Sequence, residues 1–339
     1  MRDSILFVVA VFVNLSLPIT RCAVAEENKL TGEDALHLLD SLVAEQRKTL
    51  AKLETYEVKF TQTSDGGLSL DPQKQFHKTH IKRSQDRVWA ERQSDVTVFD
   101  HPEDSYSVAY KLVANSEYVA SFAKGHNPHG PILSGRVWEH DNFAAMSRQG
   151  NNMLNTVTNS YDFTKSGYGD GHKTLADISE LARNANWHVE VSWNSSAKTP
   201  PLYQVRAFIA ESDSRPRQEW TIDAARSCIV TRSVLYSPND SPRRQFVAEP
   251  KEVEPNVWFP VLWTQSYYGD SPTPKLVVRL EVHFLAMGVQ PETAECQLAN
   301  LHMPKECMVM RTDTRGRVSQ MAFVDNELVP RRLLQDGSR

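Results

Sequence analysis

Histidine is the residue type in this chain best suited to hold a metal ion or move a proton, and histidines occur in two close pairs. His77 and His80 lie three positions apart, so on a strand they point to opposite faces and do not share one ion. His126 and His129 lie in the loop-like stretch KGHNPHGP, where they could converge on zinc, although zinc requires a third or fourth ligand. Solvated loop histidines are the simpler interpretation, so we expect no metal and no cofactor.

Other patterns that carry catalysis are missing from the sequence. It has no Gly-x-Ser-x-Gly elbow, no His-Glu-x-x-His zinc helix and no Gly-Lys-Ser/Thr phosphate loop. The run Gly269-Asp270-Ser271 is followed by Pro272, which is typical of a hairpin loop rather than a nucleophile. We therefore expect a protein that is not an enzyme.

Cysteines are few after the first 25 residues, where Cys228, Cys296 and Cys307 remain. An odd number excludes a fully paired disulfide framework. Either Cys296 and Cys307 form one disulfide across their short loop, or all three thiols are reduced and buried. Neither arrangement indicates a catalytic cysteine.

The first 25 residues are typical of an export signal. They combine a positive start at Met1-Arg2, an apolar run from Ile5 to Val13 and a small-residue site at Ala23-Val24-Ala25. No later stretch approaches the roughly 20 apolar residues of a spanning helix, so we expect no transmembrane segment after signal removal. The formal net charge of −4 argues against nucleic-acid binding, which requires a concentrated basic surface. The expected location is periplasmic or otherwise outside the cytoplasm.

The elements expected after the signal are one amphipathic helix and many short strands. Apolar residues recur at helical spacing from Leu36 to Leu53, with Thr31 and Asp34 placed to cap that helix. The period then changes to two in TYEVKFTQT and in the stretches around 75–82, 87–92, 96–100, 105–114, 187–193, 203–210, 217–223, 228–236 and 276–284. Strands with one wet face favour an antiparallel sheet. The predicted fold class is α+β, with a curved antiparallel sheet forming an incomplete, unclosed β-barrel wrapped around helices.

The domain boundaries expected are a signal at 1–25, an open-barrel domain at 26–286 and a C-terminal hairpin segment with a tail at 287–339. A helical and loop-rich insert is expected at about 134–186, including a helix from Thr174 in which Asp177, near the start, is placed to assist capping. The stretch 141–157 is a weaker helix candidate because of Gly150. The terminal hairpin is expected to turn at Thr314-Arg315-Gly316.

The stretch NVWFPVLWTQSYY, residues 256–268, carries aromatic residues on both sides of a strand. Such a strand is either covered on both faces or exposes apolar surface for a purpose. Pro260 cannot donate to a sheet ladder and favours an edge or a bulge, so we interpret the strand as an edge at the rim of a cavity.

A set of large, mostly apolar residues is predicted to point inward and bind a ligand, although the same residues would equally fill a packed barrel. The predicted ligand-binding residues are Tyr56, Val58, Phe60, Trp89, Trp220, Ile222, Phe259, Trp263, Leu280 and Phe284.

The order of these parts resembles the periplasmic lipoprotein carrier superfamily, LolA/LolB-like and outer-membrane lipoprotein-sorting, in a divergent long form. The resemblance covers about Leu30 to Phe284 and lies in the initial helix, LETYEVKFTQT, WTIDAARSCIVTRSVLY and NVWFPVLWTQSYY. It implies an open barrel enclosing an apolar cavity that accepts acyl chains. The insert and the terminal hairpin have no counterpart in the shorter carriers, and no arginine can be matched to the one they place in the cavity.

Two function classes follow from the residues and the resemblance together. The first is an exported binding protein of the cell envelope for an acyl chain, a lipoprotein or another apolar ligand. The alternative is a structural or interaction protein of the envelope with a fully packed core, in which Trp258 and Tyr268 meet a protein partner.

Overall fold

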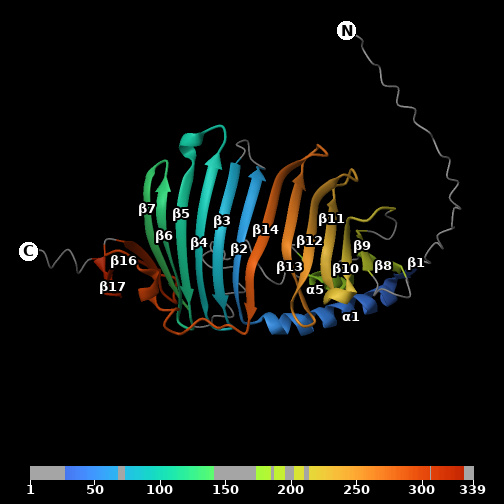
Figure 1. Cartoon of the computed structure of the whole chain (residues 1–339), viewed down its shortest axis with the longest axis horizontal. Helices are drawn as coiled ribbons and strands as arrows, with labels where there is room; N and C mark the ends of the chain where they lie inside the picture. Colours follow the sequence, from blue (N-terminus) through green and yellow to red (C-terminus); the bar gives the residue numbers. More distant parts are fainter. Residues whose placement is uncertain are drawn as a thin grey trace, which may run out of the picture.

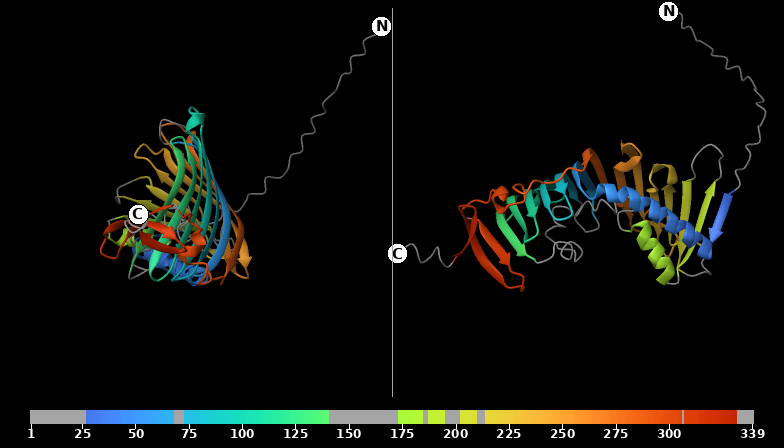
Figure 2. Two further views of the ribbon diagram at one scale, coloured as in Figure 1. Left: turned by 90° about the vertical axis from the view of Figure 1, so that its left-hand side faces the viewer. Right: turned by 90° about the horizontal axis from the view of Figure 1, so that it is seen from below.

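The computed structural model describes residues 27–67, 73–140, 173–184, 187–194, 202–209, 214–305 and 307–331. These residues form a 17-stranded sheet and two α-helices. Figure 1 shows the strands side by side in one long layer, and Figure 2 shows that this layer bends into an arc. The expected insert residues 141–172, the signal and the tail lie outside the described residues.

The elements have the following bounds in chain order. The first half contains β1 Glu27–Thr31, α1 Gly32–Leu50, η1 Ala51–Leu53, β2 Tyr56–Gly66, β3 Gln73–Arg83, β4 Val88–Val98, η2 Pro102–Asp104, β5 Tyr106–Ala114, β6 Tyr118–Asn127 and β7 Gly130–Glu139. The second half contains α5 Leu175–Asn184, β8 His188–Asn194, β9 Leu202–Phe208, β10 Gln218–Asp223, η3 Ala224–Arg226, β11 Ile229–Tyr236, β12 Pro242–Glu254, β13 Val257–Tyr268, β14 Pro274–Met287, η4 Leu298–Leu301, β15 Met308–Thr312, β16 Val318–Val324 and β17 Glu327–Pro330.

The sheet is open because its two edge strands have one neighbour each among the described residues. Its pairing runs β1, β8 to β14, β2 to β7, then β15, β16 and β17. Every pair is antiparallel except β7 with β15, which are parallel. The predicted α+β class with a curved, unclosed antiparallel sheet is confirmed. The parallel pair shows that the expected C-terminal hairpin continues the same sheet, with β17 as a further strand.

The two helices lie on the inner side of the arc, which we call the concave face (Figure 2). Helix α1 buries Leu39, Leu42 and Val43 in the same core cluster as Phe60 of β2 and Trp220 of β10. Helix α5 packs beside α1. The spacing of the apolar residues in each helix places them on one stripe, and that stripe packs against the buried side chains of the concave face.

The caps of the two helices differ from each other. The Asp177 carboxylate accepts hydrogen bonds from the backbone N–H and the hydroxyl of Thr174, at 2.7 and 2.9 Å, and the Asp177 N–H donates back to the hydroxyl at 3.2 Å. This reciprocal box confirms the predicted role of Asp177. Thr31 is the N-cap of α1, but its side chain makes no capping hydrogen bond, so that expectation was wrong.

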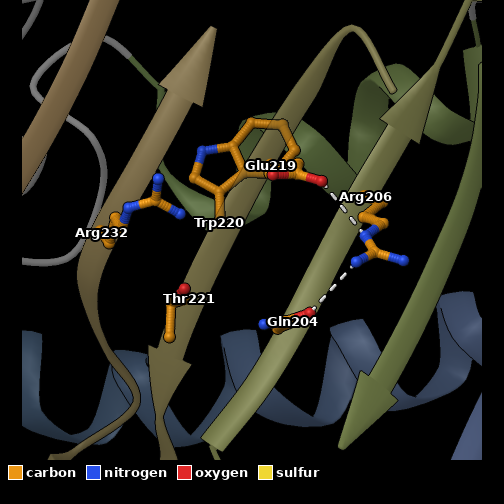
Figure 3. Close-up of a pocket in the computed structure, with 6 residues that line it drawn as sticks. All are labelled: Gln204, Arg206, Glu219, Trp220, Thr221 and Arg232. Atoms are coloured by element: carbon orange, nitrogen blue, oxygen red, sulfur yellow. Dashed lines mark hydrogen bonds and ion pairs between the residues drawn. The ribbon is translucent and has the colours of Figure 1, made fainter. Parts of the chain in front are cut away.

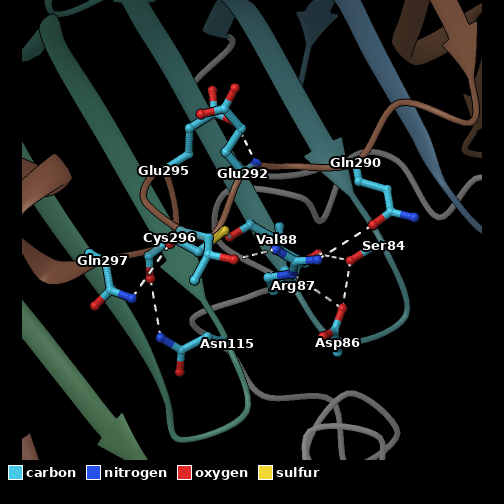
Figure 4. A network of polar contacts seen from close by, with 11 residues as sticks. Ser84, Asp86, Arg87, Val88, Asn115, Gln290, Glu292, Glu295, Cys296 and Gln297 are labelled. Carbon is cyan, nitrogen blue, oxygen red and sulfur yellow. Dashed lines mark hydrogen bonds and ion pairs between the residues drawn. The ribbon is translucent and has the colours of Figure 1, made fainter.

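A second core lies on the outer side of the arc, the convex face. Residues 288–305 leave β14 and cross this face, where Leu301 and Met303 pack with Phe122 and Val137 of β6 and β7. Polar contacts fasten the crossing segment to the strand ends (Figure 4). Arg87 donates a hydrogen bond to the Thr293 hydroxyl at 2.8 Å. Lys82 donates to the Glu295 carboxylate, and the side chains of Asn115 and Tyr118 both donate to the Cys296 carbonyl.

The aromatic strand β13 occupies the middle of the sheet, between β12 and β14. The interpretation of this stretch as an edge strand was therefore wrong. Pro260 lies at a bulge instead, which is the other position that proline favours in a sheet. Pro260 pairs with Pro250 and Leu262 with Glu249, which leaves Val261 as an extra residue in a bulge. A missing N–H is tolerated there because the ladder is already interrupted.

Candidate functional site

Eight of the ten predicted ligand-binding residues lie together on the concave face. They belong to one buried cluster, with exposed fractions from 0% to 5%, and they are Tyr56, Val58, Phe60, Trp220, Ile222, Phe259, Trp263 and Leu280. Leu39 of α1 and Leu175 of α5 are buried in the same cluster. At this end of the arc the sheet and helices therefore form a packed apolar wall.

The other two predicted residues, Trp89 and Phe284, lie on the convex face. Trp89 alternates with Val88 and Ala90, and these two neighbours are the ones buried in the concave core. Phe284 lies on the convex face because of a bulge in β14. Val282 pairs with Phe60, but Phe284, two residues later, pairs with Lys59, only one residue away from Phe60. The extra residue reverses the alternation that placed Phe284 with Leu280 in the sequence.

Both convex aromatics contact charged or polar side chains rather than an apolar cavity. Trp89 meets the His80 ring edge-on at a centroid distance of 4.8 Å. The Lys59 ammonium lies 5.1 Å from the centroid of Phe284, which is 42% exposed. Sequence alternation without knowledge of the bulge could not separate Phe284 from the rest, and for Trp89 the alternation within β4 does not say which face is concave.

Aromatic residues that the sequence reasoning missed are exposed on the concave face at β5 and β7. Tyr106 is 37% exposed and Trp138 is 43% exposed. The register places them in rows with concave-face residues, since Tyr106 pairs with Val96, and Trp138 pairs with Val119. The alternation of Tyr106, Val108, Tyr110 and Leu112 in the sequence was the available signal. This end of the concave face offers apolar surface to a ligand.

Polar side chains form a band across the middle of the concave face. His77, Thr79 and Ser94 are 5%, 3% and 4% exposed. Burial lowers the pKa of His77 from 6.5 to about 4, and the nearby Arg92 guanidinium acts in the same direction against a weaker opposite effect of Asp95. His77 is therefore a neutral hydrogen-bonding group at neutral pH.

His80 lies on the opposite face from His77, as the sequence predicted. Its Nε2 is 2.7 Å from the Glu57 carboxylate on the convex face. His126 is exposed on β6, and His129 lies in the short turn after it. Within the described parts of the chain, no group of three or more His, Cys, Asp or Glu side chains could hold a metal ion.

A cavity of about 480 Å³ lies over strands β14 and β2 to β4, and most of its lining positions have side chains that alternate onto the convex face. Its lining residues are Lys59, Phe60, Lys78, Thr79, His80, Glu91, Arg92, Gln93 and His283. Several of the charges there are paired, with Lys59 3.5 Å from Glu57 and Lys111 3.0 Å from Glu91. The paired charges fit a solvated sheet face.

A smaller depression lies on the convex face of β9 to β11 (Figure 3). Its volume is about 20 Å³, which is room for about one water molecule. The Arg206 guanidinium bonds to Glu219 at 3.2 Å and to Gln204 at 3.4 Å, so the polar groups satisfy one another. This depression is too small for an organic ligand.

The thiols are free and buried among the described residues, so the alternative of reduced cysteines is the one observed. The Cys296 thiol donates to the Val88 carbonyl at 3.6 Å, and the Cys307 thiol to the Met308 carbonyl at 3.6 Å. No described helix is both long enough and apolar enough to cross a membrane.

Comparison with known proteins gives similarity in structure and none in sequence. No family model matches the chain, and no curated protein matches it significantly. An outer membrane lipoprotein-sorting protein domain from Vibrio parahaemolyticus aligns with a TM-score of 0.35 and 8% identity, covering 78% of this chain and 99% of that one. A DUF1329 family protein from Desulfovibrio piger aligns with a TM-score of 0.34 and 10% identity, covering 78% and 98%.

A LolA superfamily protein from Nitrosomonas europaea aligns with a TM-score of 0.28 and 9% identity, covering 77% of this chain and 96% of that one. At these scores the similarity is coarse, so the function follows from the side chains of this chain.

Proposed function

We propose that this chain is an exported, non-enzymatic binding protein of the cell envelope that holds an acyl chain, of a lipid or a lipoprotein, against the concave face of its open sheet. The export signal in the first 25 residues supports the compartment. The missing catalytic motifs support a binding role without covalent chemistry. The unclosed sheet leaves exposed aromatic surface on the concave face of β5 and β7, where a long ligand can lie.

One observation carries this proposal. Tyr106 and Trp138 are 37% and 43% exposed on the concave face near opposite ends of β5 to β7, and the rows of the buried Val108 and Leu112 lie between them. Large aromatic side chains at the edge of an apolar core are a surface that an apolar ligand covers favourably, at about 25 cal/mol per Å². Tyr106 is level with about Gly130, eight residues along β7 from Trp138, so an acyl chain that lies along these strands would extend from one ring towards the other.

A specific observation favours the alternative, an envelope scaffold without a ligand. The eight predicted ligand-binding residues at the helix-covered end are at most 5% exposed. They fill that end as a core does. The acyl chain is therefore placed at the β5 to β7 end and not under α1.

Titration with a fluorescent long-chain fatty acid tests the proposal. The double variant Tyr106→Ser, Trp138→Ser is expected to weaken binding about tenfold or more, or roughly 1.4 kcal/mol. The matched control is Phe76→Ser, because Phe76 is 39% exposed on the convex face of β3. The control should bind as the unaltered chain does. Equal losses in both variants, or a chain that binds no probe and carries no lipid by native mass spectrometry, would contradict the proposal.

A further inference from the structure

Three buried polar atoms fall on one row of the concave face. They are the Trp263 indole nitrogen, the Gln62 side-chain oxygen and His77 Nδ1, and none has a hydrogen-bond partner within the described part of the chain. Trp263 pairs with Leu280, Leu280 with Gln62, and Gln62 with His77. The row therefore crosses β13, β14, β2 and β3 without a break.

Such a row destabilises the folded state. A buried polar atom without a partner costs about 1–3 kcal/mol, and native structures contain few of them. The two that lie side by side on adjacent strands, at Gln62 and His77, indicate a place where a bound molecule supplies the missing hydrogen bonds. The side chains of Trp263 and His77 are each 5% exposed, so solvent at the surface does not meet this need.

The donors and acceptors on the row define what fits. His77 Nε2 lies 3.3 Å from the Gln75 side-chain oxygen, and this oxygen can only accept. Nε2 therefore carries the proton and Nδ1 is an acceptor. The Gln62 oxygen is also an acceptor, whereas the Trp263 indole can only donate. The row offers two acceptors, side by side, and one donor two strands further along.

Anions and cations both fit this pattern poorly. A carboxylate or phosphate brings acceptors and cannot bond to His77 Nδ1 or to the Gln62 oxygen. A cation would lie close to the Arg92 guanidinium, which already influences His77. A hydroxyl or amide group has a hydrogen to donate between Gln62 and His77 and an oxygen that can accept.

We propose that the two adjacent acceptors of this row, Gln62 and His77, bind the neutral polar group, a hydroxyl or an amide, of an apolar ligand on the concave face, next to the packed core that contains Trp263. The proposal rests on the function proposed above and specifies its ligand class. Because adjacent strands lie about 4.8 Å apart, one hydroxyl or amide reaches both Gln62 and His77.

Four probes of equal chain length test the inference: a long-chain alcohol, a primary amide, a methyl ester and a fatty acid. Each competes with a fluorescent acyl probe on the purified mature chain. The alcohol and the amide are expected to bind about tenfold more tightly than the ester and the acid, or roughly 1.4 kcal/mol. Equal affinity for all four probes overturns the inference but leaves the proposed function standing. Failure of all four to bind overturns the proposed function itself.

Variants locate the preference on the row. His77→Leu and Gln62→Leu remove the acceptors and are expected to abolish the preference for alcohol and amide while the ester still binds. The matched control is His80→Leu, which changes the same strand on the opposite face and should keep the preference. An unchanged preference in both acceptor variants overturns the assignment. If either variant does not fold by circular dichroism, the four-probe comparison on the unaltered chain decides.

Discussion

Lys82 on β3 and Glu295 on the crossing segment form an ion pair on the convex face, with Nζ and Oε1 2.5 Å apart. The hydrogen bond to Glu295 raises the pKa of Lys82. Burial acts to raise the pKa of Glu295, but the hydrogen bonds from Lys82 and from the Glu292 backbone, together with the nearby positive charges, outweigh burial and lower this pKa. The pair fixes residues 288–305 to a strand more than 200 residues earlier in the chain.

Removing this pair is expected to destabilise the fold slightly. Both side chains are partly exposed, at 22% and 28%, so Lys82→Met should lower the free energy of unfolding by about 0.5–1 kcal/mol. Because the pKa of Glu295 is lowered, its contribution is present above the unfolded value and is lost as the pH falls through the folded value. Urea unfolding of Lys82→Met, Glu295→Gln and the double variant measures the coupling. A double variant whose loss equals the sum of the single losses would show that the two residues do not interact.

Acid should destabilise the protein through His77. Its pKa falls from 6.5 in the unfolded chain to about 4 in the folded one, chiefly through burial. Since the unfolded chain takes up the proton first, stability is full above pH 6.5 and is lost as the pH falls towards 4, by at most roughly 3 kcal/mol. Urea unfolding at several pH values should give a flatter dependence for His77→Leu than for His126→Leu, whose side chain is exposed. Identical slopes would refute the assignment.

Much of the sheet could be predicted because apolar and polar residues alternate strictly within several single strands. The pattern Trp187 to Trp193 gave β8, and TYEVKFTQT gave β2. Strand β12 was missed because Pro242 and Pro250 interrupt it, and prolines in a central strand argue against a strand. The stretch KGHNPHGP looked like a loop, yet it holds the two-residue turn between β6 and β7. Strand β7 runs to Glu139, so it includes the first residues of the stretch 134–186 that is expected to be an insert.

The candidate site was only partly accessible to sequence reasoning for a similar reason. Bulges decide which residues of a strand share a face. The bulge before Phe284 cannot be predicted from the sequence of β14 alone. The polar row depends on pairing between strands that lie far apart in the chain, such as Leu280 of β14 and Gln62 of β2. Alternation within one strand carries no information on that register.

Two residues predicted alike from the sequence should respond differently to truncation. Phe60 is 1% exposed in the concave core, so Phe60→Ala is expected to lower the free energy of unfolding by about 3–5 kcal/mol. Phe284 is 42% exposed on the convex face, so Phe284→Ala should change the free energy of unfolding by about 0.5 kcal/mol or less. Chemical denaturation measures both. A large loss at Phe284 would mean that this face is covered.

The three buried thiols should be inert in the native protein and reactive after unfolding. Burial raises the pKa of Cys228 and of Cys296 to about 11, and raises that of Cys307. Since the thiolate is the reactive form, the native mature chain is expected to resist iodoacetamide at neutral pH. The same chain in denaturant without reductant should gain one adduct on each cysteine, counted by mass spectrometry. Modification of Cys228 alone under those conditions would reveal a disulfide between Cys296 and Cys307 and contradict the free thiols of the fold.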